Sequence, residues 1–453
     1  MGKGFVAMLR KVKRGDLSWS GLVSEEQVNQ ACARAEYKSQ ARLFKPFTTL
    51  VTFLSQLLSG NRACQGAVDG LIAERVAAGK PKNSTDTGGF CKARKRIPEA
   101  VYWDLARQSG RSVEDEADPA WHWRGHRVRI ADGSTLHVLD TKDTLEEYPL
   151  QKNLTPGLHY SLVRILVVFS LAVGTVLDAA INPYQGKGTG ETAMLRGLAA
   201  LFDPGDVLLA DRYFSGYWDL VFWAWRGVHV VTRLPASRRA DFRKGTKLGK
   251  DDHLISWHKP PRPDWVSPDE AEQGPSTLTL REVRVWVSVK GFRTRVIVIV
   301  TTLLDAEKYP KDALADLYRL RWQAELNLRS LKTHLDMDYL SCKSPEMLRR
   351  EFATYLLAYN SIRKVSTEAA RHRGVNPLAI SFTHTKQSIL EFFPRLHGAV
   401  DREHWIVSLL ETVAEILVGD RPGRIEPYTS KKRPKDYPHP KETRRKYKQR
   451  KTK

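Results

Sequence analysis

The chain has 453 residues, of which 42% are hydrophobic and 27% are charged. This composition suits a globular protein of two or three domains and excludes an intrinsically disordered chain. Lys and Arg outnumber Asp and Glu by 73 to 51, a formal net charge of +22, which favours a polyanionic partner, most often nucleic acid. The longest apolar run, residues 165–177, is too short and too interrupted by polar residues for a membrane span, so we expect no membrane association.

The first residues and the cysteines indicate the cellular compartment. The chain begins without the apolar stretch of a signal peptide. His122 and His126 lie four residues apart, but no third ligand lies nearby, so a zinc site is not favoured. The four cysteines are far apart and lack paired metal-ligand spacing, which is typical of free thiols in a reducing compartment: Cys32, Cys64, Cys91 and Cys342. We therefore expect a cytoplasmic protein.

Residues 48–110 have the apolar spacing of short helices, interrupted near residues 59–60 and 79. The third helical segment carries four basic residues just before Pro98: Lys92, Arg94, Lys95 and Arg96. This cluster predicts a helical DNA-binding region that holds cations against phosphates. A solvated basic face of an ordinary helix is an equal alternative.

From about residue 127 apolar and polar residues alternate, which indicates strands. The order from there is strand, strand, strand, helix, strand, helix, strand, and the later elements are expected near residues 162–169, 175–181, 189–202, 207–210, 217–225 and 228–232. Three meandering strands followed by alternating units predict an α/β fold, a mixed sheet with helices on both faces. Ribonuclease-H-like domains use this order of elements.

A Pro-rich and charged stretch followed by valine-rich strands interrupts the alternation, which predicts a β-rich insertion. After Pro310 the pattern is mainly helical, and the end of the chain holds 14 basic against three acidic residues. We expect a helical N-terminal DNA-binding region at residues 1–120 and a ribonuclease-H-like catalytic domain in two pieces, residues 121–234 and 294–345. The β-rich insertion between these pieces covers residues 235–293. A helical C-terminal region at residues 346–420 and a basic tail at residues 421–453 follow.

Three carboxylates could meet in such a fold. Asp132 follows the first strand and Asp211 follows the fourth, and these two strands normally lie side by side. Glu325 lies in the helix after the insertion. Three carboxylates in one pocket repel one another unless cations compensate them, and two hard divalent cations do so with oxygen ligands. Two such ions can clamp the attacking and leaving oxygens of a phosphodiester.

Each acid also has an ordinary structural interpretation. Asp132-Gly133 between two alternating runs is a typical hairpin turn. Asp211 at a strand-to-helix junction is a typical helix N-cap. Glu325 could pair on an exposed face with Arg321 or Arg329, each one helical turn away.

The helix around Glu325 carries further polar residues on one side. If the helix is straight, Tyr318, Arg321, Glu325 and Lys332 project within an arc of roughly 60°. An acid flanked by two cations and a phenol suits a surface that grips phosphate. An ion-paired exposed face is the alternative.

The spacing Tyr318-x2-Arg321-x3-Glu325-x6-Lys332 resembles the YREK motif of the insertion-sequence DDE transposases that form DNA hairpins. The segments at 131–135, 206–214 and 318–325 are similar to the same family, and the resemblance extends from about residue 45 to about residue 435. It implies a ribonuclease-H-like catalytic domain in which Asp132, Asp211 and Glu325 are the catalytic metal ligands. It also implies that Tyr318, Arg321 and Lys332 contact the terminal phosphates.

The resemblance further implies two Mg²⁺ ions, with Mn²⁺ as substitute. The partners would be the inverted-repeat ends of the element and target DNA, bound by a homodimer in the bacterial nucleoid. Water would cut one strand, and the freed 3′-hydroxyl would attack the other to form a hairpin that is reopened and joined to target DNA. These steps are in-line phosphoryl transfers and need no covalent nucleophile.

One strand of the predicted insertion departs from the pattern of the family. Some hairpin-forming relatives stack a flipped base on a tryptophan in the last strand of the insertion, but residues 295–300 contain none, and Trp286 is either a substitute or an ordinary tryptophan. The glycine-rich run 186–190 lacks P-loop spacing, so no nucleotide cofactor is expected, and a loop into the next helix suffices to explain the glycines.

Two alternative functions remain for the chain. One is a ribonuclease-H-like nuclease without strand transfer, and the other is a non-catalytic DNA-binding derivative.

Overall fold

A ten-stranded mixed sheet forms the centre of the protein. The computed structural model describes residues 23–41, 43–151, 160–287, 295–395, 401–418 and 449–450. The strand order is β3-β2-β1-β4-β5-β9-β8-β7-β6, with the short strand β10 (Tyr339–Leu340) added to β1. Strands β1 to β3 pair antiparallel, whereas β1, β4 and β5 pair in parallel. The first five strands are β1 (Val128–Val138), β2 (Ser161–Ser170), β3 (Val176–Pro183), β4 (Val207–Leu209) and β5 (His229–Arg233).

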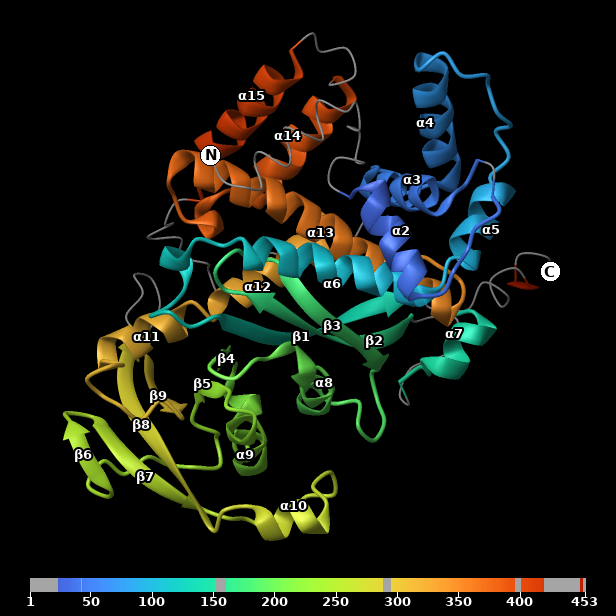
Figure 1. Cartoon of the computed structure of the whole chain (residues 1–453). Helices are drawn as coiled ribbons and strands as arrows, with labels where there is room; N and C mark the ends of the chain where they lie inside the picture. The colour runs from blue at the N-terminus through green and yellow to red at the C-terminus, as the bar shows by residue number, and fades with distance from the viewer. Residues whose placement is uncertain are drawn as a thin grey trace.

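Helices cover both faces of this sheet (Figure 1). Helices α6 (Glu99–Asp115) and α13 (Pro345–Arg373) lie on one face, and α8 (Glu191–Gly197) and α9 (Tyr217–Trp225) lie on the other. Alternation along β1 produces this division, because Ile130 belongs to the core under α13 whereas its neighbour Ala131 belongs to the core with α8 and α9. The predicted α/β fold, a ribonuclease-H-like mixed sheet between helices, is confirmed.

The side chain of Asn360 joins three of these elements. From α13 its amide nitrogen donates to the carbonyls of Ala106 in α6 and Val176 in β3, and its oxygen accepts from the Val176 N–H at 2.7 Å. Gly110 allows this close approach, because a Cβ there would lie 1.9 Å from the Val176 carbonyl oxygen. Helix α6 therefore lies directly on the backbone of β3.

The strands that follow β5 continue the same sheet. Strand β9 pairs antiparallel with β5, and β8, β7 and β6 follow it outward. The buried guanidinium of Arg281 in β8 binds both carboxylate oxygens of Asp252 in β7 and holds these strands together. The expected turn at 290–291 lies outside the described residues. The elements of this segment are β6 (Thr246–Gly249), β7 (Asp252–His258), α10 (Pro268–Gln273), β8 (Thr277–Val287) and β9 (Arg295–Thr301).

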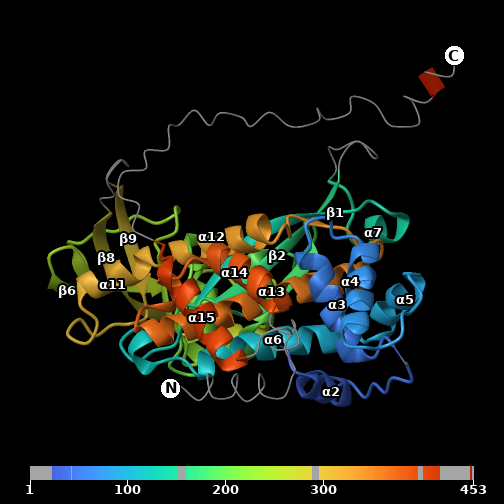
Figure 2. The ribbon, with the colours of Figure 1, turned by 90° about the horizontal axis from the view of Figure 1, so that it is seen from above.

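Further helices lie toward the two ends of α13 in both ribbon views (Figure 2). Helices α2 (Glu25–Arg34), α3 (Pro46–Leu58), α4 (Cys64–Ala77) and α5 (Gly88–Arg96) lie toward one end, and α14 (Phe382–Arg395) and α15 (Arg402–Glu415) toward the other. The short helices predicted before residue 110 are thus confirmed. No helix within the described ranges is both long and apolar enough to span a bilayer. Most of the predicted basic tail, residues 421–448 and 451–453, lies outside the described residues.

Candidate active site

Parallel pairing brings the two aspartates to the same level of the sheet. Strand β1 pairs with β4 so that Ile130 lies opposite Leu209. Asp132 and Asp211 each come two residues later, at the carboxyl end of this pairing. The predicted adjacency of the first and fourth strands is therefore confirmed.

Asp132 does not form a turn. Strand β1 runs without interruption from Val128 to Val138, because β2 pairs with it throughout and Val167 lies opposite Asp132. The hairpin alternative is wrong, and so is the expectation that the strand ends before Asp132. One oxygen of the Asp132 carboxylate accepts the N–H of Gly133 at 3.0 Å.

The three acids lie within electrostatic reach of one another. The pKa of Asp132 is raised to about 6, mainly by burial and to a smaller extent by the carboxylates of Glu325 and Asp211. The guanidinium of Arg321 acts in the opposite direction. The site therefore concentrates negative charge around a partly desolvated carboxyl group, and one cation partly compensates that charge.

Asp211 caps a short turn as well as facing the site. Its carboxylate accepts the N–H of Tyr213 at 2.7 Å and begins the 3-10 turn Arg212–Phe214, so the predicted N-cap is present. Its backbone carbonyl accepts the hydroxyl of Thr232 in β5 at 2.6 Å. These bonds fix the backbone of Asp211 at the end of β4.

The helix that carries Glu325 is broken, so the predicted straight helix is wrong. Leu320 is 39% exposed at the break, whereas Ala324 and Leu328 are buried beneath Glu325. A π-helical segment follows and changes the direction of later side chains, a feature frequent at functional sites. The three segments are α11 (Lys311–Arg319), α12 (Trp322–Arg329) and the π-helix Ser330–His334.

The guanidinium of Arg321 holds Glu325. Its Nη2 donates to Oε1 of Glu325 at 2.7 Å, the ion pair that the alternative interpretation predicts. In the described part of the chain, no three His, Cys, Asp or Glu side chains are arranged to hold a metal ion. Glu325 is turned toward Arg321, and its side chain is 38% exposed and has room to rotate.

Lys332 reaches β1 from the π-helical segment. Its ammonium donates to the hydroxyl of Ser134 at 3.2 Å and to the carbonyl of Thr135 at 2.9 Å, and it pairs with Asp338 at 3.0 Å. Ser134 and Thr135 follow Asp132 closely in β1. Lys332 thus ties the end of the helix to the strand that carries Asp132.

Tyr318 faces the site from the end of α11. Burial raises the pKa of its phenol, the neighbouring cations Arg321 and Arg233 lower it, and the carboxylate of Asp211 raises it again. Sequence reasoning missed Arg233. The available signal was its position at the carboxyl end of β5, the strand next to the one that carries Asp211.

The N-terminal basic cluster is divided between surface and interior. Lys92, Lys95 and Arg96 are exposed on α5. The guanidinium of Arg94, by contrast, lies between two aromatic rings and donates to the side-chain oxygen of Gln56 at 3.0 Å. Those rings belong to Phe53 and Phe90, with centroids at 4.7 and 4.6 Å. Arg94 is therefore a buried structural residue, which corrects its prediction as a DNA contact.

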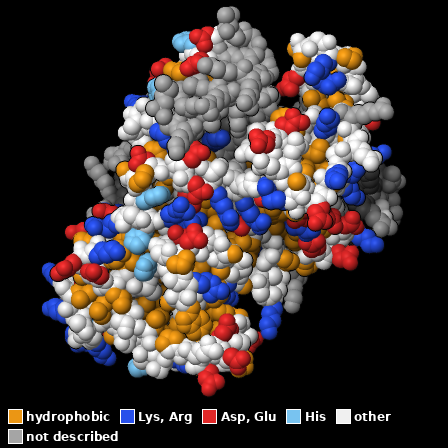
Figure 3. Space-filling model, in the orientation of Figure 1, with side chains coloured by type: hydrophobic (Ala, Val, Ile, Leu, Met, Phe, Trp, Pro, Cys, Tyr) orange, Lys and Arg blue, Asp and Glu red, His pale blue; other side chains and the backbone are white. Residues whose placement is uncertain are grey.

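Basic side chains also gather away from this cluster. Figure 3 shows a row of Lys and Arg across the middle of one face, at the level of α6. Acidic side chains are interspersed with them. Part of the positive charge of the chain is thus displayed on the body of the protein.

Comparison with known proteins gives a consistent result. Residues 123–361, more than half of the chain, match the family model described as "Transposase DDE domain". The chain is 26% identical over 329 residues to transposase InsG of insertion sequence element IS4 from Escherichia coli K12, and the match covers 71% of each chain. It is 41% identical over 61 residues to the transposase of insertion sequence element IS421 from Escherichia coli, which covers 14% of this chain and 16% of that one.

Among solved structures, the chain is similar to a piggyBac transposase in its synaptic complex with hairpin DNA, with a TM-score of 0.40 and 10% identity. That match covers 89% of this chain and 85% of the other. The family model alone spans every element of the site, from before Asp132 to beyond Lys332. This chain belongs to the insertion-sequence transposases with a transposase DDE domain.

Proposed function

We propose that this transposase cuts and joins DNA at the carboxylates Asp132, Asp211 and Glu325, with two divalent cations as cofactors, Mg²⁺ or in its place Mn²⁺. The donor set suits these ions, because hard cations prefer carboxylate oxygens. The raised pKa of Asp132 supports the assignment, because Arg321 only partly compensates the charge of a buried acid that lies among other acids. When bound, the cations would stabilise the charge that develops on the attacking and leaving oxygens.

The cationic side chains have separate tasks in this proposal. Arg321 holds Glu325 until cations and DNA arrive, and its guanidinium is then available for a phosphate of the DNA end. Lys332 orients the segment of β1 after Asp132 and contributes positive charge near the same phosphates. Tyr318 offers a phenol that can donate a hydrogen bond to phosphate, and burial keeps it protonated.

The proposed reaction is a series of in-line phosphoryl transfers at the inverted-repeat ends of the element. Water attacks first, the freed 3′-hydroxyl then attacks the opposite strand to form a hairpin, and the reopened end is joined to target DNA. Trp286 in β8 is 59% exposed, which suits stacking on a flipped base. The protein would act as a homodimer on double-stranded DNA in the bacterial nucleoid, with exposed Lys92, Lys95 and Arg96 as further phosphate contacts.

The division of labour along the chain follows the same proposal. The helical region before residue 121 binds DNA, residues 121–234 and 294–345 form the catalytic domain, and residues 235–293 form its insertion. Residues 346–420 support the catalytic domain, and the basic tail, residues 421–453, adds affinity for DNA.

The electrostatic interaction of Asp132 with both Glu325 and Asp211 carries this proposal, and single substitutions test it. We expect Asp132→Asn, Asp211→Asn and Glu325→Gln each to reduce Mg²⁺-dependent cleavage of element ends by more than about 100-fold while end binding is retained. Asp269→Asn on exposed α10 is the matched control. Parental cleavage by any of the three variants would contradict the role of that residue.

The products distinguish the alternative functions. Hairpin ends and joined products on a denaturing gel would support transposition by this route. Cut ends without joined products would indicate a nuclease. Trp286→Ala should retain the first nick and lose the hairpin, and an unchanged hairpin yield would remove Trp286 from the mechanism.

A further inference from the structure

A glutamate outside the three-acid set lies against the strand that carries Asp132. A Cβ added to Gly133 would stand 2.2 Å from Cδ and 2.3 Å from Oε1 of Glu191, the first residue of α8. Glycine at position 133 therefore leaves the space that the Glu191 carboxylate occupies, beside the backbone of the residue that follows Asp132.

The backbone does not require glycine at this position. Gly133 lies within β1 and is not among the glycines with positive φ, so its conformation is open to any residue. Successive residues of a strand face opposite sides of the sheet. Asp132 interacts with Arg321 and Glu325 on one side, so a side chain at position 133 would point to the other side, where α8 lies. The role of Gly133 is to leave space for the Glu191 carboxylate.

The edge of β1 is open at this level. Pairing with β4 ends at Ile130 and Leu209, and β10 rejoins the same edge only at His137. Asp211 follows the last paired residue of β4 by two positions and so lies at the level of this opening. Carboxylates that approach β1 from opposite faces, Glu325 from α12 and Glu191 from α8, can therefore meet there.

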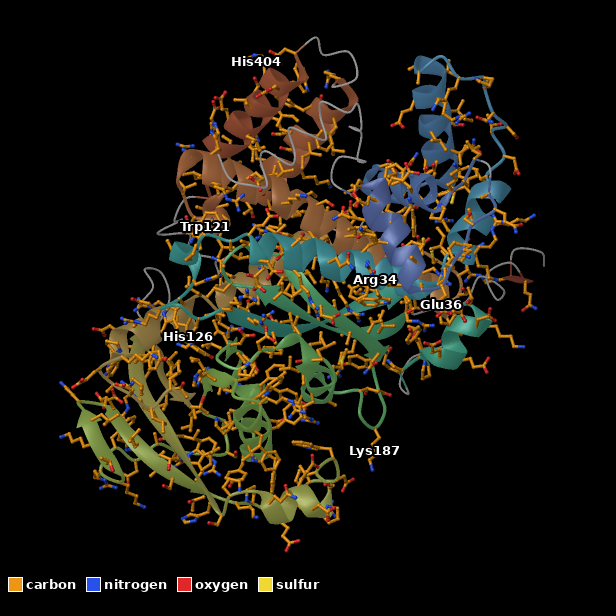
Figure 4. All side chains as sticks on the ribbon, in the orientation of Figure 1. Arg34, Glu36, Trp121, His126, Lys187 and His404 are labelled. Atoms are coloured by element: carbon orange, nitrogen blue, oxygen red, sulfur yellow. The ribbon has the colours of Figure 1, made fainter. Side chains whose placement is uncertain are left out.

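A second contact places the start of α8 beside Asp211. A Cβ on Gly190 would lie 3.9 Å from the hydroxyl of Tyr213, whose N–H binds the Asp211 carboxylate. The Asp211 carboxylate also raises the pKa of Glu191, after the larger effect of burial. The loop into α8 is marked in Figure 4 by Lys187, which points away from the sheet at the loop tip.

Glu191 makes no contact that would explain it as a structural residue. Its carboxylate has no hydrogen bond or ion pair to any residue that the structure describes, and Arg164 is the one cation that acts on its pKa. The Nε of Arg164 is itself buried without a partner. A half-buried carboxylate is costly unless a ligand compensates it.

We infer that Glu191 is a fourth carboxylate of the active site and contributes to divalent-cation binding beside Asp132 and Asp211. This inference rests on the proposed function, because it adds a ligand to the proposed cation site. Four carboxylates would balance the four positive charges of two divalent cations before the DNA phosphates arrive. Glu191 would then let the transposase bind its cations in the absence of DNA.

The test is Mn²⁺ binding to the DNA-free protein, measured from the electron paramagnetic resonance signal of unbound Mn²⁺. We expect Glu191→Gln and Asp132→Asn each to weaken Mn²⁺ binding by about tenfold or more. Glu272→Gln on exposed α10 is the matched control and should bind as the parent does. Thermal unfolding without metal verifies that each variant is folded.

Gly133→Ala gives an independent arm, because it removes no carboxylate. Its Cβ would displace the flexible end of Glu191, so Mn²⁺ binding should weaken several-fold while the fold is retained. In a Glu191→Ala background the same substitution should have no further effect on Mn²⁺ affinity.

The outcomes separate this inference from the proposed function. Parental Mn²⁺ binding by Glu191→Gln together with weak binding by Asp132→Asn would overturn the role of Glu191 and leave the three-acid site intact. Parental binding by both variants would overturn the cation site itself. Weak binding by Glu191→Gln alone would support Glu191 and contradict the assignment of Asp132.

Discussion

Asp132 lies within strand β1, and burial there disfavours the charged form of its carboxyl group. Its pKa of about 6 in the folded protein, against 3.8 for an ordinary aspartate, means that its charge costs stability at neutral pH. We predict that Asp132→Asn raises the free energy of unfolding of the metal-free protein by about 1–3 kcal/mol at pH 7.5. Urea unfolding in the presence of a chelator measures this difference.

The pH dependence of this difference follows from the direction of the pKa shift. At about one unit or more below pH 3.8 the carboxyl group is neutral in both states, so parent and variant should be equally stable. Between pH 4 and 6 the unfolded state ionises first, so the parent should lose stability relative to the variant as pH rises. A difference that shrinks over this interval would contradict the burial of a repelled carboxylate.

Sequence reasoning predicted the three acids but not all of their surroundings. Strand order and register were sufficient for Asp132 and Asp211, because adjacent parallel strands align their ends. Arg233 and Glu191 were missed because their distance from the three acids depends on how β5 and α8 pack beside β1 and β4, which the sequence does not reveal. A glycine that makes room for a distant glutamate has no local signal in the sequence.

The π-helical segment determines where the motif lysine reaches. It directs Lys332 to β1, so we expect Lys332→Ala to reduce cleavage by about 10–100-fold through misplacement of the strand around Asp132. It should also reduce the salt dependence of end binding by about one phosphate contact. Arg329→Ala, at an exposed position of α12, is the matched control. Equal losses in the two variants would show that charge alone matters.

In helix α5, neighbouring residues have opposite roles. Arg94→Ala should lower the free energy of unfolding by about 2–4 kcal/mol, because the guanidinium loses two aromatic faces and the bond to Gln56. Lys95→Ala should leave stability unchanged and weaken DNA binding. Thermal unfolding and a DNA titration measure both effects. A stable Arg94→Ala protein would contradict the burial of Arg94.

Helices and strands were predictable from the sequence where the periodicity of apolar residues is clear. The apolar strands β2 to β5 lie near their expected positions because their periodicity is clear. Strand β1 continues through Asp132-Gly133, because pairing with β2 overrides the local turn preference. The break at Leu320 has no proline or glycine nearby, so it follows from tertiary contacts that the sequence does not reveal.

On the scale of the whole molecule, excess positive charge predicts strongly salt-dependent DNA binding. Half of the net charge, +11 of +22, belongs to residues 421–453. We predict that the affinity of the full chain falls steeply with salt, and that a chain ending at residue 420 shows a shallower slope. Fluorescence anisotropy on DNA of unrelated sequence measures both slopes. Identical slopes would exclude the tail from phosphate contacts.

Catalysis by the three acids requires that they share cations across β1, β4 and α12. Anomalous diffraction from crystals grown with Mn²⁺ and a DNA end tests this most directly. We predict two Mn²⁺ ions about 3.5–4 Å apart between Asp132, Asp211 and Glu325, with Glu325 released from Arg321. Mn²⁺ bound elsewhere, with Glu325 still paired to Arg321, would contradict catalysis by these three carboxylates.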